Sequence, residues 1–484
     1  MCILVVIKQK TTHHLISEKD YLLMGTKITK IGITNDKISA RGGLPFFLRY
    51  IEKIRLYSLV SGIILSKLTK SNKGLQLRGF LKQMFAFFID GTDMSISGFD
   101  QRKEDEGYAS LLENSIDKMA SSHQIKRFFS KMSIVNNLVF NKILHELFIW
   151  RLKITNPTII ELGIDTMVMD NDYAKKREGN ETTYKKKKGF QSLHICWGPF
   201  LIDVLFRKGS AHSNHGTDYT DRVRAVVELI RKRYSEEAPI IICADSGFAD
   251  QRAYEDFEEN LDIHYITTSR MYNGVKEYVQ EIPADNFGEF SKNKAIWNFV
   301  EFGNKLVSWS KFRRCIYTDL QRDDDGQYLM RFRRTDTIIY TNIGLCPRVD
   351  QKLMTAGGEH YFEAETIIQK SHERGADELI NRSIKEMATK EQLPFKRFGM
   401  NRTYYYLLVI THFIFEAYKQ DVTIGIISTT VYPSTFRRKL IDFAAKITSG
   451  AGYIILNVTR SVYQTINIAE LWERCKSPPK LQIA

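Results

Sequence analysis

Three acidic residues stand at positions where side chains can hold a divalent metal ion. Asp165 follows the largely apolar run Ile159–Ile164, and Asp245 follows the run Pro239–Ala244. Such runs are typical of buried strands, and the end of a strand holds a carboxylate rigidly at the rim of a sheet. Because Mg²⁺ prefers hard oxygen ligands, the two aspartates indicate a metal site of the kind found in nucleases.

The third acidic residue, Glu378, lies in the stretch Ser371–Glu386, whose pattern predicts a helix. Arg374 precedes Glu378 by four residues and Lys385 follows it by seven, so the three side chains project from nearly one face. An arginine fork and a lysine ammonium both suit phosphate contacts beside metal ions. Each signal also has a plainer explanation, because aspartates after strands are usually turn formers and a charged helix is usually a solvated one.

The elements that must position these acids follow residue 155. Five strands are predicted at 159–166, 190–197, 200–206, 239–245 and 263–268, with helices at 217–234 and 249–260. This order predicts an α/β protein with one mixed sheet and helices on its faces. Residues 282–345 add strand-like segments at 295–302, 314–318 and 337–343, which predict a β-rich insertion.

Residues 31–154 have a helical pattern, with segments at 44–64, 75–89, 122–131 and 134–152. The segment Ser122–Lys131 mixes basic and aromatic residues, as a helix laid against a phosphate backbone does. A helix with a solvated basic face explains the segment equally well. We expect a helical N-terminal domain that binds DNA.

Composition and charge favour a folded partner of nucleic acid. The chain has 484 residues, 43% of them hydrophobic, and its 70 lysines and arginines exceed its 56 acidic residues by 14. A net positive field attracts polyanions, of which DNA or RNA is the obvious one. The length is too great for one ordinary core and suggests about two to four domains.

The remaining sequence signals concern location and redox state. The six cysteines form no C-x-x-C pair and no zinc-like spacing, so we expect reduced, structural thiols. No run approaches the roughly 18 apolar residues of a membrane helix, and the first residues do not form a signal peptide. We therefore expect a cytoplasmic protein without membrane association. Residues 1–30 are expected to be a poorly ordered extension, or Met24 to be the true start.

The spacing of Arg374, Glu378 and Lys385 resembles the Tyr-x-x-Arg-x-x-x-Glu-x-x-x-x-x-x-Lys signature in one branch of the DDE transposases of bacterial insertion sequences. The match covers roughly residues 155–420, and the Tyr place holds Ser371, a departure from the family's pattern. The resemblance implies a ribonuclease-H-like catalytic domain at 155–281 and 346–420. It also implies a β-rich insertion at 282–345, and residues 421–484 remain as a C-terminal region.

By the same resemblance Asp165, Asp245 and Glu378 are the catalytic residues and the ligands of two Mg²⁺ ions, with Mn²⁺ as a substitute. Asp165 is expected to bridge the ions, because two ions can stabilise both the attacking and the leaving oxygen of a phosphoryl transfer. Ser371, Arg374 and Lys385 are expected to contact phosphate. The implied partners are the terminal inverted repeats, target DNA and a second copy of the chain, and the bound protein would lie at the nucleoid.

Other residues are weaker candidates. Asp170 is a second choice as a ligand, Asp203 and Asp250 are unconvincing, and His212 with His215 lacks a third ligand placed by spacing. Asn214, His215 and Arg222 are possible DNA contacts, as are the arginines of the insertion: Arg313, Arg314, Arg331, Arg333 and Arg334. The basic and aromatic stretch 394–402 is expected to touch the DNA backbone. A helical tail at 435–447 and the segment 468–474 are candidates for dimerisation.

Two other functions are compatible with the sequence. A ribonuclease-H-like nuclease would release DNA ends without joining them. A catalytically dead DNA-binding protein derived from a transposase would bind inverted repeats without metal-dependent cleavage, and the presence of all three acidic residues argues against it.

Overall fold

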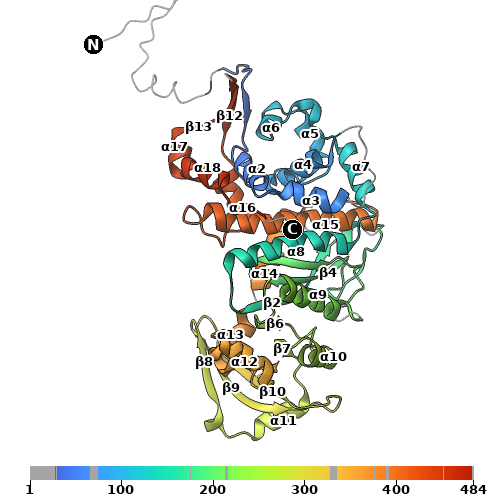
Figure 1. The fold of residues 1–484 in the computed structure, drawn as a ribbon, viewed down its shortest axis with the longest axis vertical. Helices are drawn as coiled ribbons and strands as arrows, with labels where there is room; N and C mark the ends of the chain where they lie inside the picture. Colours follow the sequence, from blue (N-terminus) through green and yellow to red (C-terminus); the bar gives the residue numbers. More distant parts are fainter. Residues whose placement is uncertain are drawn as a thin grey trace, which may run out of the picture.

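The computed structural model of the chain describes residue 28 and residues 30–65, 75–174, 176–212, 216–327, 335–373, 376–388, 392–450 and 452–481. They form an elongated molecule with helices at one end, a sheet through the middle and β-strands at the other end (Figure 1). One cluster of buried apolar residues reaches from the N-terminal helices into the sheet. The helical end and the sheet therefore share a core.

Ten strands form a single mixed sheet. Their order across the sheet is β3-β4-β2-β6-β7-β11-β10-β9-β8, and β5 also pairs with β4. The strands are β2 (Ile160–Asp170), β3 (Glu181–Thr182), β4 (Lys188–Trp197), β5 (Phe200–Leu205), β6 (Ile240–Ala244), β7 (His264–Ser269), β8 (Gly288–Lys292), β9 (Ala295–Asn304), β10 (Arg313–Arg322) and β11 (Asp336–Thr341).

The central strands define the class of the sheet. β6 is parallel to β2 and β7 is parallel to β6, whereas β4 is antiparallel to β2 and β5 to β4. Parallel strands are covered on both faces, which is why Ile240, Ile241 and Ile242 are all buried. Three antiparallel strands followed by two parallel ones, in the order β5-β4-β2-β6-β7, is the ribonuclease-H-like arrangement. The predicted α/β fold class is confirmed.

The β-rich insertion continues the core sheet. β11 pairs with β7 in antiparallel register, with Tyr340 opposite Thr267. Ile241 and Ile266 of the core share a buried cluster with Ile316 of the insertion. Strands β8 to β11 therefore extend the core sheet instead of folding as a separate body.

Helices cover the sheet. α8 and the long α15 pack on β5 and on each other, α14 packs on β2 and α15, and α13 packs on β6 and β7. The helices of this part are α8 (Asn137–Thr155), α9 (Asp218–Arg233), α10 (Gln251–Glu255), α11 (Asn273–Glu281), α12 (Pro347–Thr355), α13 (Ala364–Glu373), α14 (Ala376–Met387) and α15 (Phe398–Tyr418). Every side chain of α15 from Thr403 to Tyr418 is buried, so this helix is the centre of the core.

The N-terminal helices lie on the other side of α15 from the sheet (Figure 1). They are α2 (Leu44–Lys53), α3 (Leu56–Leu65), α4 (Leu77–Asp90), α5 (Gly98–Glu104), α6 (Glu106–Leu111) and α7 (Ser122–Met132). The C-terminal elements are α16 (Pro433–Phe436), β12 (Ala445–Gly450), β13 (Tyr453–Val458), α17 (Arg460–Thr465) and α18 (Ile468–Lys476). Short 3-10 and π turns connect elements at 116–118, 172–174, 256–260, 284–286, 359–362, 419–423 and 437–441.

The two ends of the chain are joined. β1 (Lys37–Ser39) pairs antiparallel with β12, which pairs with β13 to complete a three-stranded sheet. α18 packs on α2, with the rings of Phe46 and Trp472 at 5.7 Å. The apolar side chains of the segment 468–474, a predicted dimerisation element, thus contact an N-terminal helix of the same chain.

The predicted helical tail at 435–447 is only partly correct. Helical structure ends at Ile441, and Ala445 begins β12. Ile447 lies in that strand opposite Lys37, so pairing with the N-terminal strand overrides any local helical preference. Within the described residues no helix is long and apolar enough to cross a membrane. The five described cysteines are free thiols, and Cys2 lies outside the described residues.

Candidate active site

Asp165 and Asp245 lie side by side at the edge where two central strands part. The parallel register of β2 and β6 ends at the pair Ile164 and Ala244, and each aspartate is the next residue of its strand. Neighbouring strands are about 4.8 Å apart, which brings the two backbones close together. Both side chains are half-buried. β2 does not end at residue 166, as the sequence predicted, but continues to Asp170 because it still pairs with β4.

Backbone amides hold one oxygen of each aspartate. The N–H of Thr166 donates to Oδ1 of Asp165 at 2.7 Å, and the N–H of Gly247 donates to Oδ1 of Asp245 at 2.8 Å. The second bond forms the tight turn that ends β6. Because a carboxylate oxygen has two lone pairs, these bonds orient the groups without exhausting their capacity to bind a cation.

Helix α14 is attached to the first aspartate. The side-chain amide of Asn381 donates to Oδ2 of Asp165 at 2.7 Å. Glu378 precedes Asn381 by three residues, so both lie on one face of the helix. The contact fixes the helix that carries Glu378 against the strand that carries Asp165.

A buried histidine lies next to this contact. His194 of β4 is opposite Asp165, and its Nε2 lies 2.6 Å from the hydroxyl of Tyr405. Burial lowers the pKa of His194 to about 3, so the ring is neutral at pH 7. The neutral imidazole, held by Tyr405, adds no charge beside the aspartate.

One tyrosine is influenced by all three acids. Tyr184, in the turn between β3 and β4, has a raised pKa because of burial and then because of the negative charges of Asp165, Asp245 and Glu378. Each of the three carboxylates is therefore near enough to Tyr184 for its charge to act on the phenol. Among the described residues no three His, Cys, Asp or Glu side chains are close enough to enclose a single metal ion. Carboxylate oxygens are the ligands that hard cations such as Mg²⁺ prefer, so the chemistry of these side chains fits such ions, and Glu378 is exposed.

The three residues predicted to bind phosphate do not all lie on the helix that carries Glu378. Lys385 lies on α14, seven residues after Glu378, and its charge reaches Asp170. Ser371 lies on α13, whose described part ends at Glu373, and α14 begins at Ala376. Arg374 lies outside the described residues.

The weaker candidates have structural roles. Asp203 is buried and accepts hydrogen bonds from both Nε and Nη2 of Arg222, each at 2.8 Å, so the predicted contact of Arg222 with DNA is not supported. Asp250 caps α10. Asp170 forms a 2.9 Å ion pair with Lys187, and although burial opposes its charge, the Asp172 amide and this lysine lower its pKa. His212 is exposed, whereas residues 213–215, with Asn214 and His215, lie outside the described residues.

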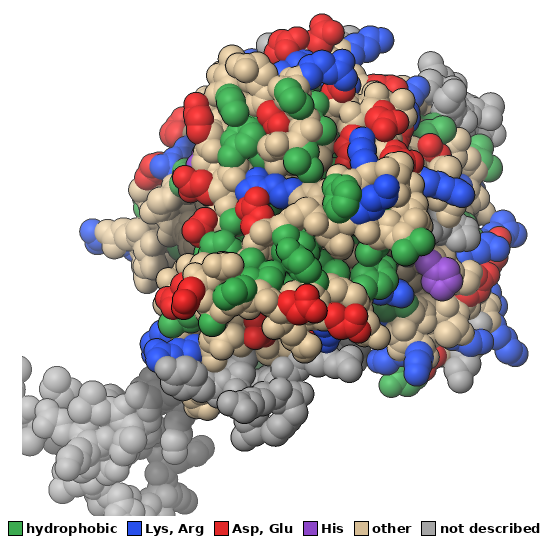
Figure 2. Space-filling view, turned by 90° about the horizontal axis from the view of Figure 1, so that it is seen from below, with side chains coloured by type: hydrophobic (Ala, Val, Ile, Leu, Met, Phe, Trp, Pro, Cys, Tyr) green, Lys and Arg blue, Asp and Glu red, His purple; other side chains and the backbone are tan. Residues whose placement is uncertain are grey.

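The insertion arginines that are described contact acids of the protein. Arg313 is buried against Glu258, and Arg314 binds both carboxylate oxygens of Glu301 at 2.9 and 2.8 Å. Arg331, Arg333 and Arg334 lie outside the described residues. Figure 2 looks onto the insertion end, where acidic and basic side chains are interspersed. The described part of this face offers DNA no continuous basic surface.

Two basic stretches predicted to touch DNA lie together. α7 buries Phe128 and Phe129 and exposes basic residues on its other side: His123, Lys126, Arg127 and Lys131. Phe395 packs on Phe129 with ring centroids 4.7 Å apart, which brings the exposed Lys396 and Arg397 next to α7. A basic surface is thus built from segments more than 260 residues apart in the sequence.

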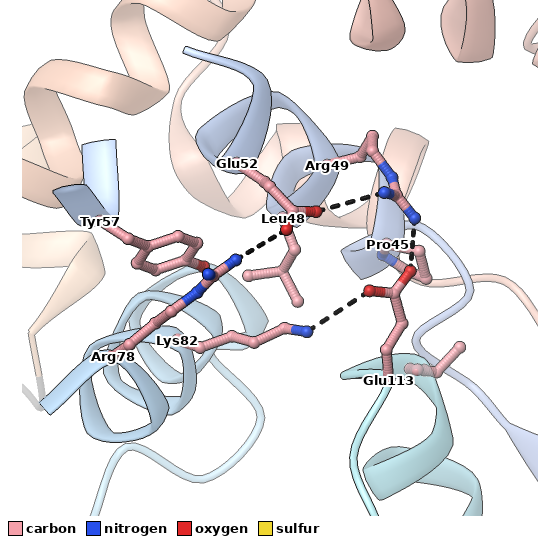
Figure 3. A pocket seen from close by; sticks show the side chains of 9 residues that line it. Pro45, Leu48, Arg49, Glu52, Tyr57, Arg78, Lys82 and Glu113 are labelled. Atoms are coloured by element: carbon pink, nitrogen blue, oxygen red, sulfur yellow. Dashed lines mark hydrogen bonds and ion pairs between the residues drawn. The ribbon is translucent and has the colours of Figure 1, made fainter. Parts of the chain in front are cut away.

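A pocket among the N-terminal helices has a structural explanation (Figure 3). Arg49 pairs with Glu52 at 3.2 Å and with Glu113 at 2.6 Å, while Arg78 and Lys82 pair with the same two acids. The cavity has a volume of about 40 Å³, enough for about one water molecule. The charged side chains that line the pocket pair with one another, and these ion pairs link α2, α4 and the turn after α6.

Sequence reasoning missed Asn381, His194 and Tyr184. Asn381 had a usable signal, since it lies one helical turn after Glu378. No local sequence signal pointed to His194 or Tyr184, because their proximity to Asp165 depends on the register of β4.

A ribonuclease-H-like sheet with aspartates at the parting of its two central strands defines a class of enzymes that transfer phosphoryl groups in nucleic acids. The sequence matches the family described as "Transposase DDE domain group 1" over residues 25–477, and the chain belongs to this family. The resemblance to DDE transposases drawn from the sequence is thereby confirmed, and the protein is a transposase-family enzyme acting on DNA. Members of the family generally use divalent metal ions.

Among solved structures, a piggyBac transposase synaptic complex with hairpin DNA, determined by cryo-EM, is similar to this chain. The similarity covers 91% of this chain and 83% of that chain, with 13% sequence identity and a TM-score of 0.39. No curated protein matches the sequence at a significant level.

Proposed function

We propose that the protein is an active transposase that cleaves DNA at the terminal inverted repeats of its own element and joins the freed ends to target DNA. The observation that carries the proposal is the position of Asp165 beside Asp245, with the Glu378 helix bound to Asp165 through Asn381. Water would attack in the cleavage step and a terminal 3′-hydroxyl in the joining step.

Asp165, Asp245 and Glu378 would hold two Mg²⁺ ions, or Mn²⁺ in their place. When bound, two such ions stabilise the charge that develops on the attacking and leaving oxygens. Asp165 would be one of the ligands, and hydrogen bonds from Thr166 and Asn381 would keep its carboxylate in one orientation.

Basic residues near the acids would hold the DNA. Lys385, on the Glu378 helix, would contact phosphate, as would Arg374 and Ser371 by the family's signature. Residues 31–154 would bind the duplex with the exposed side of α7 and with Lys396 and Arg397 beside it. Two copies of the chain would act on the two ends of the element, in the cytoplasm and at the nucleoid.

The test is an excision and integration assay with the natural element ends on a supercoiled plasmid. Single Asp165→Ala, Asp245→Ala and Glu378→Ala variants should lose cleavage by at least about 100-fold, because each removes a metal ligand. Asp285→Ala, which removes an exposed acid of the insertion region, is the matched control and should remain active. Full activity in any of the three variants would contradict the assignment of the site.

The same assay separates the two alternatives. A nuclease without strand transfer would release the element but give no joined product. A catalytically dead DNA-binding protein would retard the repeats in a gel without cutting them at any Mg²⁺ or Mn²⁺ concentration.

A further inference from the structure

Two tyrosines are strongly exposed on neighbouring loops at the end of β2. Tyr173 follows β2 and is 93% exposed, and Tyr184, in the β3–β4 turn, is 56% exposed. A single exposed aromatic residue is common, but two on adjoining loops at the end of the strand that carries Asp165, one of them within reach of the charges of the three acids, need an explanation.

Hydrogen bonds fix the two loops to each other. The N–H of Asn171 donates to the carbonyl of Lys188 at 2.9 Å, and the ammonium of Lys187 lies 2.9 Å from the Asp170 carboxylate. Within the turn, the hydroxyl of Thr183 donates to the carbonyl of Lys187 at 2.9 Å. The tyrosines are therefore carried on one ordered ridge, defined here as residues 170–174 and 183–188.

The ridge is basic as well as aromatic. Lys185, Lys186 and Lys187 are exposed, and the ammonium of Lys185 lies 5.7 Å from the centre of the Tyr184 ring. Aromatic rings alternating with cations are the means by which proteins bind single-stranded nucleic acid, since bases stack on the rings while lysines attract phosphates. Paired bases inside a duplex offer no such free face.

We propose that Tyr173, Tyr184 and Lys185–Lys187 form a binding site for unpaired nucleotides of the DNA strand whose phosphate enters the acidic site. The site would hold the end of a strand after local melting and so present one phosphate to Asp165 and Asp245. This inference rests on the proposed function for its place in the reaction, but the binding itself can be measured separately.

The test measures fluorescence anisotropy of the full-length protein in EDTA with two labelled probes: a 20-nucleotide oligothymidylate and a 20-base-pair duplex of mixed sequence. The Y173A/Y184A double variant should bind the oligothymidylate at least about tenfold more weakly, because stacking is lost, and should bind the duplex within about twofold of wild type. Y453A/Y463A, which removes two exposed tyrosines at the C-terminal end, is the matched control and should change the binding of neither probe.

Two further variants separate ring stacking from other interactions. Y184F should bind the oligothymidylate like wild type, because the ring is retained. The single variant Y184A is measured beside it. If Y184F lost as much affinity for the oligothymidylate as Y184A, the interaction would be assigned to the hydroxyl and the stacking proposal would be overturned. The triple variant K185A/K186A/K187A should bind both probes more weakly and with a smaller salt dependence, since a protein that neutralises fewer phosphates releases fewer counterions.

Failure of this proposal is distinguishable from failure of the proposed function. Equal binding of both probes by Y173A/Y184A and wild type would overturn the ridge as a binding site, even if Asp165→Ala abolishes cleavage. Tyrosine-dependent binding of the oligothymidylate by a wild-type protein that never cuts element ends would support the ridge and reject the transposase activity.

Discussion

The side-chain amide of Asn381 donates a 2.7 Å hydrogen bond to the carboxylate of Asp165, across 216 positions of the sequence. His194 is the residue opposite Asp165 on β4, and the Asn381 side chain influences the pKa of its ring. A helix and two strands therefore meet at one amide group. The position of Glu378 relative to Asp165 depends on the Asn381 amide, since Glu378 is one helical turn away from Asn381.

Replacing Asn381 by alanine should impair the enzyme without unfolding it. An outer-shell group that orients a metal ligand typically contributes about 10- to 100-fold to metal affinity or activity. N381A should therefore need more Mg²⁺ for half-maximal cleavage, which a metal titration of the excision assay measures. Asn457→Ala, at an exposed asparagine in β13, is the control. An unchanged Mg²⁺ requirement would show that Asn381 does not position Asp165.

Removing the hydroxyl of Tyr405 should destabilise the core. Tyr405 and His194 are both buried, and their 2.6 Å hydrogen bond satisfies the imidazole. Y405F leaves that ring nitrogen without its partner, at a cost of about 1–3 kcal/mol in the free energy of unfolding. Urea denaturation followed by circular dichroism measures the loss. Y453F, at an exposed tyrosine, should leave the midpoint unchanged, and equal midpoints for the two variants would contradict the prediction.

Glu416 should make stability depend on pH. Burial raises its pKa from 4.5 to about 7, against the opposing effect of Lys419. Because the folded pKa lies above the unfolded one, the stabilisation is fully present below about pH 4.5 and is lost as the pH rises through 7. Thermal melts between pH 5 and pH 8 should show wild type losing stability relative to E416Q, whose side chain stays neutral. A constant difference between the two proteins across this range would reject the prediction.

Gly43 should be sensitive to the smallest side chain. A Cβ at this position would lie 1.6 Å from the carbonyl oxygen of Leu440, where the two ends of the chain meet. G43A should cost at least about 1–3 kcal/mol, because the backbones must separate. Gly62 is the control, since a Cβ there meets nothing within 4 Å and alanine favours the helix. Thermal unfolding should place G43A below wild type and G62A at or above it.

The sequence predicted the strands of the sheet well because their apolar runs are short and bounded. The end of β2 was placed too early, although Met167, Val168 and Met169 continue the apolar run. This error concerns a boundary, where local patterns carry the least information.

The acids of the candidate site could be proposed from the sequence, but the hydrogen bonds that position them could not. Asp165 and Asp245 were recognised as candidates because each follows an apolar run typical of a strand. The carboxyl ends of parallel strands meet at one edge of a sheet, so the two side chains were expected to lie close together. The bond from Asn381 and the opposition of His194 depend on registers that no local pattern encodes. The pairing of Lys37 with Ile447 is the extreme case, because the strands are separated by almost the whole chain.

That pairing has a consequence for how the protein is made. Translation proceeds from the N-terminus, and domains usually fold as they emerge from the ribosome. Here β1 cannot pair with β12, and α2 cannot pack on α18, until more than nine-tenths of the chain has been synthesised. A prematurely terminated product would expose the apolar face of α2 and lack its partner strand, so it should be a substrate for proteases instead of a competitor for the element's ends.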